Sequence, residues 1–204
     1  TYVQAEHAEL LGTLNGLTLT ELIVETGIHD AIAKKLNEKG KLTKNAIAEG
    51  IINNLRKTII RDQLADPKFY EQMSKLRVDL IQMRRQSTED YEAFLKQAEG
   101  LAQRLVKKTG GDYPAILHGK PEAIVLFRNL PGLPSSTFSC PEDPEERAQL
   151  ALTIDQAMRN QAPAGWKGDK AKESIVKNFL HKLMAKDGPA TLALFDIVTN
   201  QAGY

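Results

Sequence analysis

The chain has 204 residues, of which 42% are hydrophobic and 26% charged, as in an ordinary globular protein that can bury a core as one domain or two small ones. Its formal net charge of +1 excludes an argument about partners from the total charge, so that only local charge clusters are informative. No apolar run approaches the ~18 residues of a membrane span, which excludes a transmembrane protein and leaves no expectation of a membrane partner.

Helix signals begin near the N-terminus. Thr18 and Glu21 have the spacing of a capping box, in which side chain and backbone satisfy each other's free hydrogen-bonding groups. This predicts a short helix over residues 19–25 that ends near Gly27, since glycine readily adopts the conformation that closes a helix. A second helix is expected to follow and to end at Gly40.

Three further helices are predicted before residue 110, each with a polar or proline-containing start. Thr43 can cap the first, and Asp66-Pro67 places a capping acceptor before a proline at the second. Residues 88–90 open the third, which Gly110-Gly111 closes. In the helix after Thr43 one apolar stripe recurs every four residues, at Ile47, Ile51, Leu55 and Ile59.

The amino-acid composition changes between residues 110 and 144. Six of the nine prolines fall there, and the string LPGLPSSTFSCP has the composition of turns. We interpret residues 110–143 as an exposed connector with one short helix, over residues 121–128. The alternative, a long ordered loop packed on a single core, is equally compatible with the sequence.

Helices resume at Asp143-Pro144, where acidic residues follow at the positive end of a helix that should run to about Gln161. Residues 170–186 are predicted to form an amphipathic helix, with Ile175 among its inward-facing residues. Gly188-Pro189 starts a last helix. The sequence therefore predicts an all-α protein of about seven to nine helices. They form a single array or two helical subdomains, residues 1–109 and 144–204, joined by the connector.

Recognisable catalytic motifs are absent. Gly119-Lys120 is followed by Pro121, which lacks the hydroxyl of a phosphate-binding loop. The four histidines are scattered, and Cys140 is alone, so neither a metal site nor a disulfide framework is expected. Residues 66–68 have the D-x-K spacing of some nucleases, but capping of a helix explains this aspartate better. The sequence thus gives no catalytic residue, and without a signal peptide the expected location is the cytoplasm.

Basic residues cluster between residues 34 and 61, where eight lysines and arginines stand against two acidic residues. Basic helix faces bind phosphate with little sequence preference, so this cluster and the Arg84-Arg85 pair are candidates for contact with double-stranded DNA. The more conservative interpretation is a solvated helix face, with Arg84-Arg85 as partners of a helix dipole. The candidate DNA-binding residues are Lys34, Lys35, Lys41, Lys44, Arg56, Lys57, Arg61, Arg84 and Arg85.

The sharpest local feature is the string GWKGD at residues 165–169, which holds the only tryptophan and precedes a lysine-rich helix. A helix start can bind an anion, and an indole can stack on a base. The alternative is that Trp166 anchors the packing and Asp169 caps the helix. A half-exposed indole would favour a site, and a buried one a scaffold. The candidate nucleotide- or phosphate-binding residues are Trp166, Lys167, Lys170, Lys177 and His181.

Several strings resemble one family. DPKFYEQMSKLRVDLIQMRRQSTEDYEAFLK is similar to the C-terminal region of the motor (R) subunit of type I restriction-modification enzymes, and TELIVETGIHDAIAKKL and NAIAEGIINNLRKTI resemble the helices before it. GWKGDKAKESIVKNFLHKL is similar to a second signature of that family, whose tryptophan loop corresponds to Trp166, Gly168, Lys172 and Glu173. The resemblance covers residues 20–108 and 160–204, and the order and spacing of the strings are more specific than any one of them.

The resemblance implies a helical tail of a larger subunit that carries a nuclease and ATP-driven motor domains. Since neither set of motifs is present here and the chain begins with Thr, we expect a fragment or processed product. Such a tail docks the DNA-translocating endonuclease onto the methyltransferase and specificity subunits, and ATP and Mg²⁺ belong to the parent subunit. A nucleic-acid or nucleotide-binding module that acts through its lysine-rich helix faces is the alternative.

Overall fold

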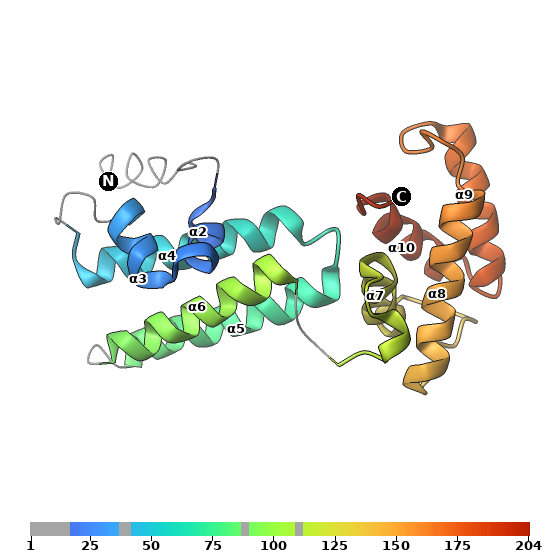
Figure 1. Cartoon of the computed structure of the whole chain (residues 1–204). Coiled ribbons are helices and arrows are strands. Elements are labelled where there is room, and N and C mark those ends of the chain that lie inside the picture. The colour runs from blue at the N-terminus through green and yellow to red at the C-terminus, as the bar shows by residue number, and fades with distance from the viewer. Residues whose placement is uncertain (1–16, 37–41, 87–89, 109–111) are drawn as a thin grey trace. The chain divides into compact units, whose positions relative to one another are not determined.

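The computed structural model describes residues 17–36, 42–86, 90–108 and 112–204 (Figure 1). They divide into two compact units: unit 1 comprises Thr1–Asp62 with Tyr70–Gly110, and unit 2 comprises Gln63–Phe69 with Gly111–Tyr204. Every regular element of the described residues is a helix, which confirms the predicted all-α class. Within these residues no helix is both long and apolar enough to cross a membrane.

Unit 1 is built around helices that bury one face each. Helix α2 packs against α4 and α6, and α4 packs against α6. Leu19 and Ile23 of α2, Leu55 of α4 and Leu95 of α6 are at most 2% exposed. The elements are α2 (Leu19–Thr26), α3 (Ile28–Ala31), the π-helix η1 (Ile32–Leu36), α4 (Lys44–Asp62), α5 (Pro67–Gln86, which belongs to this unit from Tyr70 on) and α6 (Tyr91–Lys107).

The helix starts of unit 1 follow the local rules of capping. Glu21 and Thr18 form the predicted capping box, with the Thr18 amide donating to Glu21 Oε2 at 2.7 Å. Asp90 accepts the Ala93 amide at 3.1 Å and caps α6. The predicted stops at Gly40 and at residues 110–111 lie outside the described residues, as do residues 88–89 of the predicted start.

Unit 2 has one hydrophobic core to which its middle and C-terminal segments both contribute. Leu117, Leu126 and Leu130 belong to the same buried cluster as Ile154 of α8 and Leu180 of α9. Helix α7 packs on α8, α8 on α9, and α9 on α10. The elements are η2 (Ala115–Leu117), α7 (Pro121–Asn129), η3 (Leu130–Gly132), α8 (Pro144–Gln161), α9 (Lys170–Leu183) and α10 (Gly188–Thr199).

The middle segment is therefore packed in unit 2, whereas its sequence was interpreted as an exposed connector. Residues 112–143 group with α8, α9 and α10, and the short predicted helix is α7. The physical reason is an apolar stripe at helical spacing, Ala123, Leu126, Phe127 and Leu130, that is buried on α8. The segment contributes to the core of unit 2, so it matches neither an exposed connector nor a loop on one core shared by the whole chain.

Two details of the C-terminal helices differ from prediction. Helix α9 ends at Leu183, three residues earlier than predicted, because Ala185 and Lys186 take φ angles of 51° and 63°, which a right-handed helix does not allow. Ile175, predicted to face inward, is 50% exposed. Unit 2 buries Val176, Phe179 and Leu180 of α9, so the N-terminal end of the apolar stripe, at Ile175, is left at the surface.

Candidate functional site

Trp166 is a buried packing residue. Its side chain is 3% exposed, and its ring meets that of Phe195 edge-on, with 5.6 Å between the centroids. Asp169 caps α9 by accepting the Ala171 amide at 3.0 Å. An indole in this position has no face for a nucleotide base, so the predicted stacking role of Trp166 is wrong as the chain is folded, and the alternative of a packing anchor holds.

The cationic side chains near Trp166 mostly have partners within unit 2. Lys167 Nζ donates to the Gln201 carbonyl oxygen, and burial lowers the pKa of this lysine. Lys177 Nζ lies 4.2 Å from the Phe195 ring centroid. His181 Nδ1 lies 3.1 Å from the Thr191 hydroxyl oxygen, while Lys170 is exposed at the start of α9. These contacts hold Lys167, Lys177 and His181 against the core of unit 2.

The candidate DNA-binding residues of unit 1 fall into two groups. Lys35 and Arg61 are engaged, the first with the Leu17 carbonyl oxygen at 2.7 Å and the second with Asp62 at 2.6 Å. Among the described residues five others are exposed and make no ion pair: Lys34, Lys44, Arg56, Lys57 and Arg85. Lys41 lies outside the described residues. Arg56 and Lys57 share the exposed face of α4, where they remain the best placed to meet phosphate.

Lys44 and Arg84, which lie on α4 and α5, are brought together at one pocket. This pocket, of about 300 Å³, also has Asn45, Asp90 and Tyr91 in its wall. Lys44 Nζ lies 5.2 Å from the Tyr91 ring centroid, within the range of a cation–π contact. Both cations are among the candidates drawn from the sequence, whereas Tyr91 is not. Tyr91 is half-buried, at the start of α6.

Asp66 has the structural role that its position before Pro67 predicts. It is 5% exposed and accepts the Phe69 amide at 3.3 Å, which confirms it as a capping residue of α5. Its carboxylate also accepts from Asn129 Nδ2 at 2.7 Å and from Arg128 at 3.0 Å. Burial raises the pKa of Asp66, and these hydrogen bonds counteract the rise. Such a carboxylate is occupied on both oxygens, unlike that of a nuclease.

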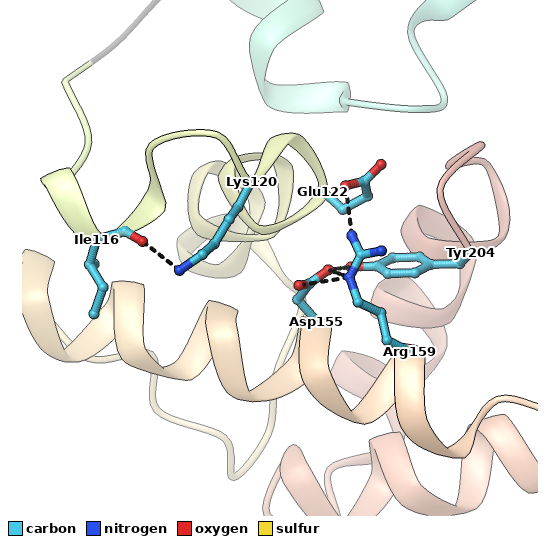
Figure 2. Close-up of polar contacts among 6 residues, drawn as sticks. All are labelled: Ile116, Lys120, Glu122, Asp155, Arg159 and Tyr204. Carbon is cyan, nitrogen blue, oxygen red and sulfur yellow. Dashed lines mark hydrogen bonds and ion pairs between the residues drawn. The ribbon is translucent and has the colours of Figure 1, made fainter.

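A partly buried polar cluster in unit 2, in which only Asp155 is fully buried, was not predicted from the sequence. Figure 2 shows Glu122, Asp155, Arg159 and Tyr204 pointing toward one another, from α7, α8 and the chain end. Arg159 bonds Asp155 at 3.1 Å and Glu122 at 2.9 Å, and the Tyr204 hydroxyl donates to Asp155 at 2.8 Å. The i, i+4 spacing of Asp155 and Arg159 was the one local signal. Because its acceptors and donors satisfy each other, we regard the cluster as a clamp on residues 200–204.

Removing the Tyr204 hydroxyl should weaken this clamp. We expect Tyr204→Phe to lower the free energy of unfolding by about 1 kcal/mol at neutral pH, since one partly buried hydrogen bond is lost. Burial, and then the bond to Asp155, raise the pKa of Tyr204 above its ordinary value of 10.0. Its contribution is therefore complete below about pH 10 and is lost as the pH rises further. Melting temperatures of both proteins between about pH 8 and 11 should converge at the alkaline end, whereas parallel curves would contradict this role.

Comparisons with known proteins identify no relative. No protein-family model, curated protein or solved structure matches the chain. Within the described ranges, no three or more His, Cys, Asp or Glu side chains gather closely enough to hold a metal ion. The candidate sites are therefore the exposed basic face of α4 and the pocket of Lys44 and Arg84.

Proposed function

We propose that the chain is a non-catalytic helical module that docks the motor subunit of a type I restriction enzyme onto its methyltransferase core. The observation that carries the proposal is the ordered set of strings at residues 20–59, 66–96 and 165–183, which resembles that subunit's C-terminal region. Such a module would act in an ATP-dependent, DNA-translocating endonuclease whose catalytic domains lie elsewhere.

The structural roles of these strings support a scaffold. DPKFY spans the start of α5, where Phe69 and Tyr70 are at most 2% exposed. DYEAF spans the start of α6, and GWKGD holds the capping Asp169 of α9. Residues that specify caps and buried contacts are those that a helical scaffold must retain, so the strings describe a fold whose exposed faces are available to partner subunits.

The test of docking is direct. The chain, carrying a tag, is mixed with a purified complex of methyltransferase and specificity subunits and run on a size-exclusion column. We expect the two to co-elute, and deletion of this segment from the parent subunit to abolish assembly while ATP hydrolysis by its motor domains persists. No co-elution, together with normal assembly of the deleted subunit, would exclude the docking function.

A second candidate function is binding of double-stranded DNA through the basic face of α4. The observation in its favour is that Arg56 and Lys57 are exposed and, among the described residues, have no carboxylate partner. Cations of this kind release counterions from DNA when they bind phosphate, which gives affinity without sequence preference.

Replacing Arg56 and Lys57 with alanine should therefore weaken binding to any duplex. Because about two phosphate contacts are lost, the slope of the logarithm of affinity against that of salt should fall by about 2. Fluorescence anisotropy with two unrelated duplexes at several salt concentrations measures both effects. Lys75→Ala is the matched control, since this lysine pairs with Glu71 at 2.9 Å. An affinity of the unaltered chain that is independent of salt would rule this function out.

A further inference from the structure

The pocket of Lys44 and Arg84 differs from an ordinary gap between helices in the chemistry of its wall. It lies within unit 1, where the starts of α4 and α6 meet the end of α5, and its volume is about 300 Å³. This is at the lower end of the volumes of small-molecule sites. Its lining combines the polar residues Thr43, Lys44, Asn45, Arg84 and Asp90 with Ala48, Tyr91 and Phe94.

Hydrogen-bond donors exceed acceptors in this wall. Lys44 and Arg84 are donors only, and the Asn45 amide adds two N–H groups. Among the described residues that line the pocket the one carboxylate is that of Asp90, and its Oδ1 is already used to cap α6 through the Ala93 amide at 3.1 Å. An occupant that offers several acceptor oxygens and no donor would match this wall, and a phosphate group has that character.

Lys44 and Arg84 are held by neighbouring side chains that leave most of their positive charge uncompensated. The Tyr91 ring lies 5.2 Å below the Lys44 ammonium, a contact that orients the side chain and leaves its N–H groups for an acceptor. Arg84 is 26% exposed and pairs with Glu49 at 3.2 Å, but Glu49 is 63% exposed, and such a solvated pair is weak. The guanidinium fork suits the oxygens of a phosphate group in a bidentate manner.

We propose that this pocket binds a phosphate group through Lys44 and Arg84, with Tyr91 as the residue that positions Lys44. The site is a concave one in unit 1, distinct from the exposed α4 face of Arg56 and Lys57, and it depends on neither docking nor duplex binding. The phosphate could belong to a nucleotide or to a nucleic-acid strand, which present the same chemistry to the two cations.

The experiment is a titration of the whole chain followed by amide signals in nuclear magnetic resonance spectra. The first probe is inorganic phosphate, with the ionic strength held constant by sodium chloride. We expect the Asn45 and Tyr91 amide signals to shift, and Lys44→Gln and Arg84→Gln each to weaken binding about tenfold. Lys75→Gln, on the same helix as Arg84 and also paired with a glutamate, should titrate like the unaltered chain.

Further probes identify the source of the phosphate. A nucleoside monophosphate that binds while its nucleoside does not indicates a terminal phosphate. A short single strand that binds equally with and without a 5′-phosphate indicates backbone phosphates. Whichever of these ligands binds, its binding should be weakened by Lys44→Gln and by Arg84→Gln. Circular dichroism establishes that the variants fold. If phosphate leaves the pocket signals unmoved, or if folded Lys44→Gln and Arg84→Gln titrate unchanged, the proposal fails, whatever the outcome for docking.

Discussion

Replacing Trp166 with alanine is expected to unfold unit 2 at a much lower denaturant concentration than the unaltered chain. Truncation of a buried tryptophan removes its transfer free energy and leaves a cavity, which together cost about 3–5 kcal/mol. The Trp166 side chain is 3% exposed and lies against Phe195, so water cannot readily enter the cavity that the truncation leaves. Since small domains are stabilised by only about 5–15 kcal/mol, this loss takes up much of the stability of unit 2.

A phenylalanine at the same position separates packing from hydrogen bonding. Within the described residues the Trp166 indole N–H is buried without an acceptor, so that Trp166→Phe loses no hydrogen bond. The phenylalanine ring fills part of the space of the indole, so the cost should be well below the ~3–5 kcal/mol of the alanine variant. Alanine is therefore expected to be far more damaging than phenylalanine, although both remove the indole.

Urea denaturation followed by circular dichroism measures these effects. Trp166 is the only tryptophan, so its fluorescence in the unaltered chain reports unit 2 specifically. Leu192→Ala is the control, since this leucine is 57% exposed and its truncation should change stability by no more than about 0.5 kcal/mol. A Trp166→Ala variant as stable as the control would mean that this residue does not anchor unit 2.

The burial of Trp166 illustrates where sequence reasoning stops. Caps are set by residues three positions apart, so Thr18, Asp90 and Asp143 could be identified locally, and with them most helix starts. Whether a loop tryptophan is covered depends on a helix more distant in the chain, here through Phe195 of α10. Flanking glycines made exposure plausible, and nothing local argued against it.

The candidate pocket depends on the same kind of long-range information. Lys44 and Arg84 could be identified as cations, but their meeting at one pocket requires the packing of α4, α5 and α6. The half-exposed position of Tyr91 follows from that packing too, because the first turn of a helix can extend beyond the core that its later residues enter. Charge clustering in the sequence gave nine candidate DNA-binding residues as one set. Only the fold separates, within that set, the residues of the pocket from those of the exposed face of α4.

The second large effect is expected at Asp187, which sequence reasoning did not single out. This aspartate is 2% exposed and ties the loop before α8 to the start of α10. One carboxylate oxygen accepts the backbone amides of Ser136, Thr137 and Phe138 at 2.6, 2.6 and 3.1 Å, and the other accepts the Ala190 amide at 2.9 Å. In Asp187→Asn an NH₂ group replaces one oxygen, so at least one set of amides loses its acceptor.

We expect Asp187→Asn to lower the melting temperature of unit 2 by roughly 5–10 °C at neutral pH. Asp196→Asn is the matched control, since Asp196 lies on the same helix and is exposed. Differential scanning calorimetry, with Trp166 fluorescence to assign the transition to unit 2, measures the change. Equal melting temperatures for the two variants would show that the Asp187 carboxylate does not hold the loop.

The acid dependence of stability gives this prediction a second signature. The Ala190 amide first, and then those of Thr137, Phe138 and Ser136, hold the pKa of Asp187 well below its ordinary value of 3.8. The folded state therefore binds this proton less tightly than the unfolded state, and the carboxylate's stabilising effect is complete above about pH 4 and is lost as the pH falls further. In Asp187→Asn no carboxylate titrates at this position, so the stability gap to the unaltered chain should narrow below about pH 4. A gap that stays constant below about pH 4 would assign the damage to altered packing, because only the loss of a charged acceptor makes the difference depend on pH.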